Sequence, residues 1–391
     1  MKLAFFTDHP VKTSETFILE LITGLEKVIG SDNLYHVAGD TKGKRVVSNT
    51  YFTNFSNQQK FQKLISNLEK AAGTNYHAAF RLKRRAAEKI FKRIFGQNNP
   101  DVAYFEFGQP AILFRRYLEH RNIPMVVHFH GMDASSAFNS KSYRLEIRKV
   151  FLYASYIITA SHHIKRLLVL KGCPVEKIHV VRYGIRVAEI EPKPWDQRNQ
   201  HHPSIIFLGR LTEKKNPMAL IHAFNLVRSV VTNARLTIIG DGPLSKQVKQ
   251  LVADLGLVDS VKFHGELSHQ EAMTVLSDHW VFAQHSVTAL NGDQEGYALS
   301  PAEAAAFELP VVSTLHNGIP EHVIDGTTGY LVREFDYESM AERIIQLLQD
   351  KHLAIKMGQN GRRNILELND PEKRIESISR LLQLAYRSQK Q

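Results

Sequence analysis

A buried strand that runs into a basic loop is encoded by Ile205-Ile-Phe-Leu-Gly-Arg-Leu-Thr-Glu-Lys-Lys-Asn-Pro217. The unbroken apolar run Ile205–Leu208 predicts a strand buried on both faces, which is typical of a parallel sheet. Gly209 ends the run, and a helical pattern follows over Met218–Val231. A strand, a loop and a helix in this order predict a βα unit, which binds ligands outside the carboxyl end of its strand.

The same alternation extends along the chain in both directions. In the second half, helical patterns such as Leu244–Leu255 separate the apolar runs Leu236–Ile239, Val261–Phe263, Trp280–Ala283 and Val311–Ser313. In the first half, patterns such as Ser14–Lys27 and Ser142–Tyr153 separate the runs Leu3–Phe6, Val102–Phe107, Met125–Phe129, Tyr156–Ala160 and Ile178–Val181. Both halves therefore predict an α/β fold with two doubly wound parallel sheets.

The length of 391 residues is too great for one core and predicts two domains. The proline-containing polar stretch Glu189–Pro203 reads as the linker, so we expect domains over 1–190 and 191–371, with 372–391 free to cross back to the first. Cys173 is the one cysteine, which excludes an internal disulfide and fits a reducing compartment. The sequence shows no signal peptide and no membrane span, so we expect a cytoplasmic protein.

The positive charge lies in the first half of the chain. Residues 1–194 hold 30 Lys and Arg against 16 Asp and Glu, whereas residues 195–391 hold 20 against 23. Such asymmetry indicates an acidic partner: anionic lipid, a phosphorylated substrate or nucleic acid. No helix-turn-helix, zinc or aromatic-stacking motif supports nucleic acid, which we exclude as a partner. The basic stretch His77–Gly96 has two compatible readings, a surface helix packed on the core or a helix on an anionic membrane.

Two carboxylates close to each other are encoded by Asn291-Gly-Asp-Gln-Glu-Gly-Tyr-Ala-Leu-Ser-Pro-Ala-Glu303. Glu295 lies in a Gly-containing loop and Glu303 at the start of an Ala-rich helix, so the loop can bring both toward one pocket. The backbone N–H groups near Leu299 and Ser300 would form a helix N-terminus, which attracts phosphate. Two carboxylates beside an anion site predict a ligand that carries both hydroxyls and phosphates.

Three further motifs follow predicted strands of the second half. Arg210 and Lys215 predict a phosphate grip, since Arg offers a bidentate fork and Lys a point charge. Gly240 opens a tight turn, and Phe263-His264 precedes a glycine against which a flat base could rest. Each motif alone is more often ordinary surface or turn, but all fall at carboxyl ends of strands in one sheet.

Together, residues Ser204–Val332 resemble the second domain of the family-4 retaining glycosyltransferases of the GT-B fold. The closest resemblance is in Glu295–Glu303 followed by Leu309-Pro-Val-Val and Gly318-Ile-Pro-Glu321. Ser14-Glu-Thr-Phe17 and His130-Gly-Met-Asp133 are similar to bacterial exopolysaccharide transferases of the colanic-acid and amylovoran type.

The resemblance implies a role for each matching residue. Arg210 and Lys215 would hold the donor diphosphate and stabilise the leaving group, Glu303 would bind ribose hydroxyls, and Glu295 would bind donor-sugar hydroxyls. His130 would reach across the cleft toward the donor sugar. The remaining donor-binding set is Gly209, Gly240, Phe263, His264, Gly296, Tyr297, Ala298, Leu299 and Ser300. On the acceptor side or in a phosphate loop the set is Ser14, Glu15, Thr16 and Asp133.

One departure from the family concerns the loop Thr7–Thr16, which lacks the usual Gly-Gly turn, so Ser14 and Thr16 substitute for it by position only. We expect no metal and no resident cofactor. The pairs His162-His163 and His201-His202 lack acidic or Cys partners at ligand spacing, and no Asp-x-Asp occurs.

The expected activity is retaining transfer of a sugar from a nucleotide-diphosphate sugar to a saccharide or lipid-linked acceptor, with peripheral membrane association left open. The alternatives are a nucleotide-sugar epimerase, a transferase for a small soluble acceptor, a glycoside hydrolase, or a non-enzymatic binding module.

Overall fold

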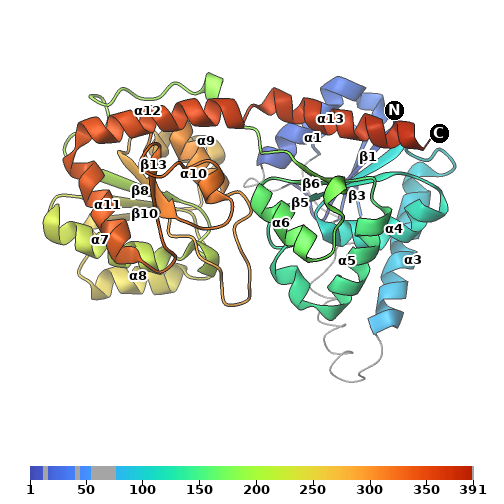
Figure 1. Cartoon of the computed structure of the whole chain (residues 1–391), viewed down its shortest axis with the longest axis horizontal. Coiled ribbons are helices and arrows are strands. Elements are labelled where there is room, and N and C mark those ends of the chain that lie inside the picture. Colours follow the sequence, from blue (N-terminus) through green and yellow to red (C-terminus); the bar gives the residue numbers. More distant parts are fainter. Residues whose placement is uncertain (12–15, 40–44, 54–75, 390–391) are drawn as a thin grey trace. The chain divides into compact units, whose positions relative to one another are not determined.

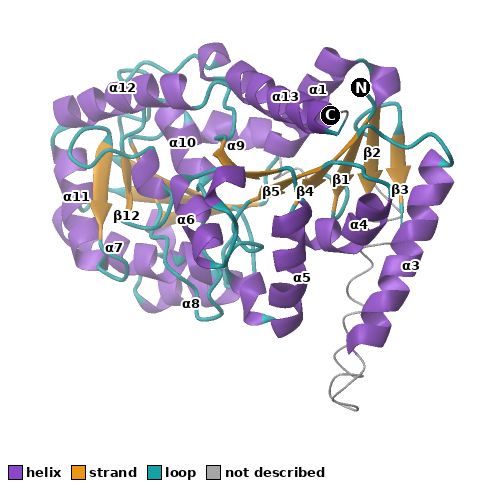
Figure 2. Cartoon of the chain, turned by 45° about the vertical axis from the view of Figure 1, so that its right-hand side comes forward, coloured by secondary structure: helices purple, strands orange, loops and turns teal. Residues whose placement is uncertain are grey.

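The computed structural model describes residues 1–11, 16–39, 45–53 and 76–389. The chain forms two compact units, Met1–Val181 with Glu372–Gln391 and Arg182–Pro371. The first unit thus ends at Val181, ahead of the limit at residue 190 drawn from the sequence. Each unit contains a parallel sheet with helices on both faces, which confirms the predicted fold class (Figures 1 and 2).

The sheet of the first unit has the strand order β3-β2-β1-β4-β5-β6-β7. The strands are β1 (Leu3–Thr7), β2 (Leu34–Ala38), β3 (Thr50–Phe52), β4 (Val102–Glu106), β5 (Met125–Phe129), β6 (Tyr156–Thr159) and β7 (Ile178–Val180). All strands are parallel, but β2 and β3 are added on one side of β1 whereas β4 to β7 are added on the other, so the order of addition switches sides between β1 and β4. The loops that follow these two strands therefore diverge there, which is where open α/β sheets bind ligands.

Helices cover this first sheet on both faces (Figure 2). On one face lie α3 (Tyr76–Phe95), α4 (Gly108–His120), α5 (Lys141–Tyr153) and α6 (His162–Leu170). On the other lie α1 (Thr16–Ile29) and α13 (Pro371–Ser388). The apolar side of α3, with Ala87, Phe91 and Phe95, is buried in the core, so the reading of this helix as a packed surface helix is confirmed.

The C-terminal helix α13 completes the core of the first unit. Its residues Ile378, Leu382 and Ala385 are fully buried with Leu21 of α1. A Cβ on Gly24 would lie 2.2 Å from the Ile375 side chain, so the two helices are in close contact. The last residues of the chain are therefore part of the same core as the first.

The sheet of the second unit has the strand order β10-β9-β8-β11-β12-β13. Its strands are β8 (Ser204–Leu208), β9 (Arg235–Ile239), β10 (Val261–Gly265), β11 (Val281–Ala283), β12 (Val311–Thr314) and β13 (Gly329–Val332). Its helices are α7 (Pro217–Val230), α8 (Ser245–Asp254), α9 (His269–Leu276), α10 (Leu299–Ala306), α11 (Tyr337–Gln349) and α12 (Lys351–Leu368). Here the order of strand addition switches sides between β8 and β11.

Among the helices of the described residues, none has the length and apolarity needed to cross a bilayer.

Helices α10 and α12 approach closely at one glycine. A Cβ on Gly358 of α12 would lie 2.0 Å from the carbonyl oxygen of Glu308, which is backbone and cannot swing away. One turn later, a Cβ on Gly361 would lie 3.4 Å from the Ala305 methyl, which is ordinary contact. The contact between the two helices therefore requires glycine at 358 and only permits it at 361.

We expect Gly358→Ala to lower the free energy of unfolding of the second unit by about 3 kcal/mol, because the two backbones must separate. Gly361→Ala on the same helix is the matched control and should be neutral or stabilising by up to about 1 kcal/mol. Urea unfolding followed by tryptophan fluorescence measures this. The chain has two tryptophans, and both Trp195 and Trp280 are buried in the core of the second unit. Equal stability of the two variants would contradict the close contact.

Candidate functional site

The loops after β8 and β9 contact each other through two glycines. A Cβ on Gly240 would lie 2.1 Å from the carbonyl oxygen of Gly209, and the Gly240 φ of 120° is itself unfavourable for other residues. The Leu211 N–H donates to the Asp241 carbonyl oxygen at 2.9 Å. The predicted residues Gly209 and Gly240 thus allow both loops to lie together at the carboxyl edge of the sheet.

Lys215 and Glu295 form an ion pair in this region, with 3.3 Å between Lys215 Nζ and Glu295 Oε1. The pair is shielded, since the side chains of Lys215 and Glu295 are 13% and 10% exposed. Burial acts to raise the pKa of the Glu295 carboxyl, but Lys215 and Lys214 outweigh it and lower the pKa to about 2. Glu295 is therefore a carboxylate at any physiological pH and holds an ammonium group beside it.

Neighbouring polar groups hold Lys215 in place. Lys215 Nζ also donates to Gln284 Oε1 at 3.2 Å, and the Ser300 hydroxyl donates to the same oxygen at 3.0 Å. Lys214 pairs with Asp293 at 3.4 Å. Arg210 lies exposed in the same loop. The structure thus brings the predicted residues Arg210, Lys215, Glu295 and Ser300 into one part of the second unit.

His316 supports the backbone of Glu295, a role that sequence reasoning missed. Its Nε2 accepts from the Glu295 N–H at 3.3 Å and lies 2.7 Å from Asn317 Nδ2, while its Nδ1 lies 2.6 Å from Glu334 Oε1. Two donors at Nε2 and a carboxylate at Nδ1 are satisfied by the tautomer with the proton on Nδ1. The fully buried imidazole therefore ties the Glu295 loop to Glu334.

Glu303 has a partner other than the Lys215 pair. It lies in α10, and its Oε1 is 3.0 Å from Nε2 of His269, the first residue of α9. This hydrogen bond raises the pKa of His269. The two glutamates thus belong to adjoining but separately bonded groups, and no direct contact joins them among the described residues.

The N-terminus of α10 has an unusual backbone. Ala298 precedes the helix with φ 55°, which turns the chain sharply between Gly296 and Leu299. The Tyr297 side chain is buried, and its hydroxyl donates to Asn369 Oδ1 at 2.8 Å. Only the backbone of Tyr297 is therefore placed to serve a ligand at this helix end.

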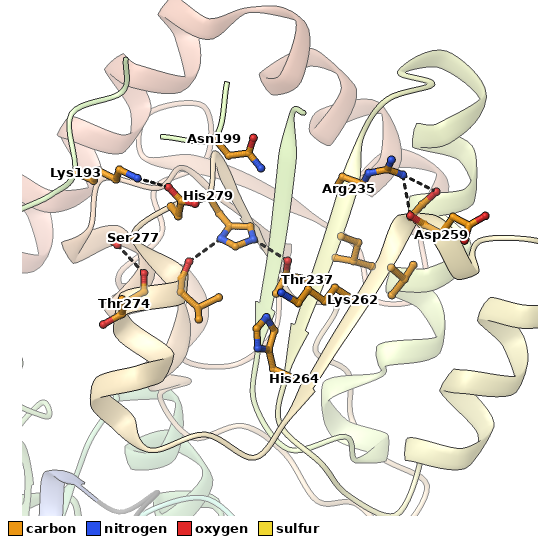
Figure 3. Close-up of a pocket in the computed structure, with 15 residues that line it drawn as sticks. Lys193, Asn199, Arg235, Thr237, Asp259, Lys262, His264, Thr274, Ser277 and His279 are labelled. Atoms are coloured by element: carbon orange, nitrogen blue, oxygen red, sulfur yellow. Dashed lines mark hydrogen bonds and ion pairs between the residues drawn. The ribbon is translucent and has the colours of Figure 1, made fainter. Parts of the chain in front are cut away.

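A cavity of about 820 Å³ lies elsewhere in the second unit, along β9 and β10 from their amino ends to His264 (Figure 3). Among the predicted residues it includes only His264, whereas Phe263 packs against the core. Its wall is held by His279, whose Nε2 lies 2.8 Å from the Thr237 hydroxyl. The lining includes none of Gly209, Gly240, Lys215 and Glu295, so we do not assign the phosphate site to this cavity.

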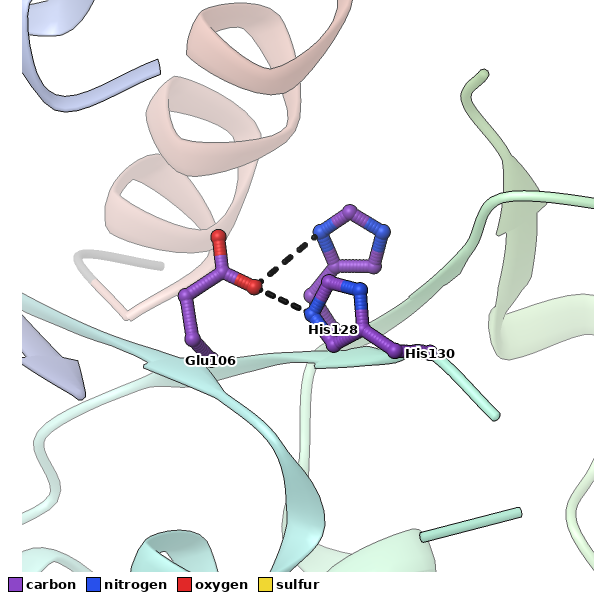
Figure 4. A group of neighbouring side chains, drawn as sticks. All are labelled: Glu106, His128 and His130. Carbon is purple, nitrogen blue, oxygen red and sulfur yellow. Dashed lines mark hydrogen bonds and ion pairs between the residues drawn. The ribbon is translucent and has the colours of Figure 1, made fainter. Parts of the chain in front are cut away.

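In the first unit, His130 is in contact with a carboxylate that the sequence did not single out. Glu106 ends β4 and is fully buried, and its Oε2 lies 2.5 Å from His130 Nε2 and 3.5 Å from His128 Nδ1 (Figure 4). The Tyr104 hydroxyl lies 3.2 Å from Glu106 Oε1 and 2.9 Å from His128 Nδ1. Burial lowers the pKa of His128 far below its usual value, so this ring is neutral.

The Asp133 carboxylate accepts hydrogen bonds from backbone N–H groups. Its Oδ1 accepts from the N–H groups of His130 and Gly131 at 3.0 and 3.1 Å, and its Oδ2 accepts from that of Gly108 at 3.1 Å. Burial raises the pKa of this carboxyl, against the effect of these donors. Asp133 therefore shapes the loop that presents His130. Thr16 begins α1, whereas Ser14 and Glu15 lie outside the described residues.

Glu106, His128 and His130 have ligand atoms within 4.8 Å of one another, and two histidines with one carboxylate can hold a divalent metal. Two ligands of a tetrahedral ion at its usual bond lengths lie about 3.3 Å apart. The 2.5 Å between Glu106 and His130 is a hydrogen-bond distance instead. The three side chains thus fit a hydrogen-bonded group better than a metal site.

Family models and curated relatives both match this chain to glycosyltransferases. Residues 191–364 match the model of "Glycosyl transferases group 1" and residues 48–189 that of "Glycosyltransferase Family 4". The chain is 31% identical over 371 residues to the colanic acid biosynthesis glycosyltransferase WcaL of Escherichia coli (strain K12), covering 89% of this chain and 91% of the relative. It is 29% identical over 374 residues to the amylovoran biosynthesis glycosyltransferase AmsK of Erwinia amylovora, with 89% and 91% covered.

Solved structures share the fold. Anabaena HepE in complex with UDP and glucose superimposes with a TM-score of 0.73 at 17% identity, covering 97% of this chain and 99% of the other.

The Glu295 pKa predicts how the stability of the second unit depends on pH. Because the folded pKa of about 2 is below the unfolded value of 4.5, the ion pair stabilises the fold above pH 4.5 and loses this contribution as the pH falls toward 2. The full contribution is about 3 kcal/mol. Tryptophan-monitored urea unfolding from pH 7 to pH 3 should show a weaker pH dependence for Glu295→Gln than for the wild type.

The control for this measurement is Glu342→Gln, which removes an exposed carboxylate of α11. It should follow the wild-type pH dependence. Parallel curves for Glu295→Gln and the wild type would show that the ion pair does not stabilise the fold.

Proposed function

The chain belongs to the group 1 and family 4 glycosyltransferases, and we propose that it is a retaining enzyme that uses a nucleotide-diphosphate sugar. The acceptor in this proposal is a hydroxyl group of a polysaccharide precursor or lipid-linked saccharide. The observation that carries the proposal is the shielded Lys215–Glu295 pair at the carboxyl edge of the second sheet. In this proposal Lys215 is the cation for phosphate, and Glu295 beside it accepts hydrogen bonds from sugar hydroxyls.

The surroundings of Lys215 favour electrostatic catalysis. Glu295 and Gln284 hold its ammonium group in place. A cation that is already in position stabilises charge on a departing diphosphate without a reorganisation cost. Arg210, exposed in the same loop, can add a bidentate contact to phosphate oxygens.

The N-terminus of α10 is the proposed binding site for the rest of the donor. Backbone N–H groups from Tyr297 to Leu299 point from a helix end, which favours an anion. Glu303, with His269 beside it, is the proposed ligand of the ribose hydroxyls. The roles of Gly296, Ala298 and Ser300 follow from the same position at the start of α10.

The proposed reaction needs no protein nucleophile. The bond from the anomeric carbon to the diphosphate oxygen breaks while Arg210 and Lys215 neutralise the leaving group. The acceptor oxygen then bonds to the same carbon on the face that the phosphate left, and its proton passes to a phosphate oxygen. Retention and independence of a metal follow from this mechanism and are part of the proposal.

The named relatives support the choice of acceptor. Both take part in the synthesis of an exopolysaccharide, colanic acid in one case and amylovoran in the other. We therefore propose a growing saccharide precursor as the acceptor of this enzyme, ahead of a small soluble acceptor.

A thermal-shift panel of UDP- and GDP-sugars tests the donor class. At least one nucleotide-sugar should raise the melting temperature, whereas free monosaccharides should not. Incubation of the stabilising donor without acceptor provides a second readout. Accumulation of an isomeric nucleotide-sugar would indicate an epimerase, and stabilisation by oligosaccharides alone would indicate a hydrolase.

Removing the cations should slow the transfer step. We expect Lys215→Ala and Arg210→Ala each to lower kcat by about 100- to 1,000-fold, the usual loss when one stabilising group of this kind is removed. Lys246→Ala, which removes an exposed lysine of α8, is the matched control and should keep wild-type activity. Retained turnover in the Lys215→Ala enzyme would eliminate the proposed leaving-group role.

Glu106 is proposed as a positioning residue for His130, which we propose binds substrate. Glu106→Gln keeps the size of the side chain and removes its charge, so we expect kcat to fall by about 10- to 100-fold, as for supporting partners of functional histidines. The donor-induced thermal shift should persist, and the pH–rate profile should change shape. Glu88→Gln, on the exposed side of α3, is the control. An unchanged pH profile with reduced stability would assign Glu106 a purely structural role.

A further inference from the structure

Helix α5 presents a basic and leucine-containing side to solvent. Its buried side, which includes Ile147, Val150 and Phe151, packs in the core of the first unit. The outward positions are Lys141, Arg144, Leu145, Arg148, Lys149 and Leu152. Leu145 is 49% and Leu152 is 72% exposed. These outward positions thus combine four cations with two large apolar side chains and include no acidic residue.

The single acidic residue of α5 does not offset this charge. Glu146 is buried and its carboxylate is bonded to Arg84 of α3 and to Lys149, the latter at 2.9 Å. Arg84 and Lys149 therefore balance the charge of Glu146. Lys141, Arg144 and Arg148 are exposed.

A second apolar segment adjoins the C-terminal end of α5. Lys177 Nζ donates to the carbonyl oxygens of Leu152 and Ala154 at 2.6 and 2.9 Å, so the segment after α6 lies against this end of the helix. Just before Lys177, the side chains of Leu170 and Val175 are 81% and 53% exposed. We name these outward residues of α5, together with Leu170 and Val175, the α5–α6 surface.

The basic helix α3 differs from this surface in one respect. Its outward side carries Arg85, Lys89, Lys92 and Arg93, but its apolar side chains Phe91 and Phe95 are buried in the core. Helix α3 thus contributes positive charge on the same face of the sheet and offers no large apolar side chain from its described residues.

We propose that the α5–α6 surface docks on an anionic phospholipid bilayer. Lysine and arginine can extend to phosphate headgroups while the leucines between them enter the acyl boundary. Each basic residue near anionic headgroups raises the partition coefficient about fivefold. Protein interface cores are depleted of charged residues, so a surface that intersperses Lys141, Arg144 and Arg148 with its leucines fits a lipid headgroup layer better.

This proposal stands apart from the proposed activity, since no residue of the α5–α6 surface belongs to the candidate site. Flotation with vesicles of phosphatidylglycerol and phosphatidylcholine, and with phosphatidylcholine alone, tests it on the full chain. The wild-type protein should float with the anionic vesicles and remain behind with the neutral ones. Raising the salt concentration should weaken the association.

Two pairs of substitutions assign the contact to this surface. Arg144→Glu with Arg148→Glu, and Leu152→Glu with Leu170→Glu, should each lower the fraction floated by tenfold or more. Two matched pairs serve as controls: Lys89→Glu with Arg93→Glu makes the same charge change on α3, and Leu226→Glu with Leu366→Glu replaces exposed leucines of the second unit. Both controls should lose at most a few-fold. Serine replaces glutamate at Leu152 and Leu170 if the glutamate pair lowers the melting temperature.

Several outcomes would overturn the proposal. Equal recovery with neutral and anionic vesicles, or wild-type flotation of both α5–α6 pairs, excludes this surface as the lipid contact. A larger loss for the α3 pair than for the α5 pair moves the contact to α3. If light scattering shows a dimer that the leucine pair dissociates while flotation is unchanged, the surface is a protein interface.

Discussion

Parallel pairing of strands is the constraint on which the candidate sites depend. It places the carboxyl ends of all strands of a sheet at one edge, so loops that are distant in the sequence meet there. In the second unit this brings Lys215, from the loop after β8, to Glu295, from the loop after β11. In the first unit it brings Glu106 at the end of β4 to His130 after β5. Neither pair could form if a strand ran the other way.

Each unit holds buried carboxylates, and the structure stabilises them in three different ways. Glu295 is matched by the opposite charge of Lys215, which lowers its pKa. Asp133 is matched by three backbone N–H groups and contributes no charge to a ligand. Glu106 is matched by the His130 ring and the Tyr104 hydroxyl. The role of each carboxylate follows from the group that it contacts. Glu295 and Glu106 contact the side chains of Lys215 and His130 at the candidate sites, whereas Asp133 contacts backbone N–H groups and fixes a turn.

Much of the fold and part of the site could be predicted from the sequence. The central strands of both sheets are unbroken apolar runs such as Leu3–Phe6, and these are easily recognised. Strand β2 was not predicted, and its run Leu34–Ala38 includes the buried His36, which lies 3.0 Å from the Thr7 hydroxyl. Strands β3 and β13, which form edges of their sheets, were not predicted either.

The proximity of Lys215 and Glu295 could be predicted because residue type and loop position carry that signal. His316, Gln284 and Glu106 were missed because their roles depend on side-chain contacts with residues that are distant in the sequence. A sequence does not indicate which of the 19 histidines will lie next to a given backbone N–H. Glu106 carried a weak signal, a charged residue at the end of an otherwise apolar strand.

The position of α13 has a consequence for the order in which the protein folds during synthesis. Residues 182–371 form a contiguous unit and can fold as soon as they leave the ribosome. The first unit begins earlier but includes Ile378, Leu382 and Ala385 in its core. Its core therefore remains incomplete until α13 has been translated. The half that is made first is thus completed after the second unit.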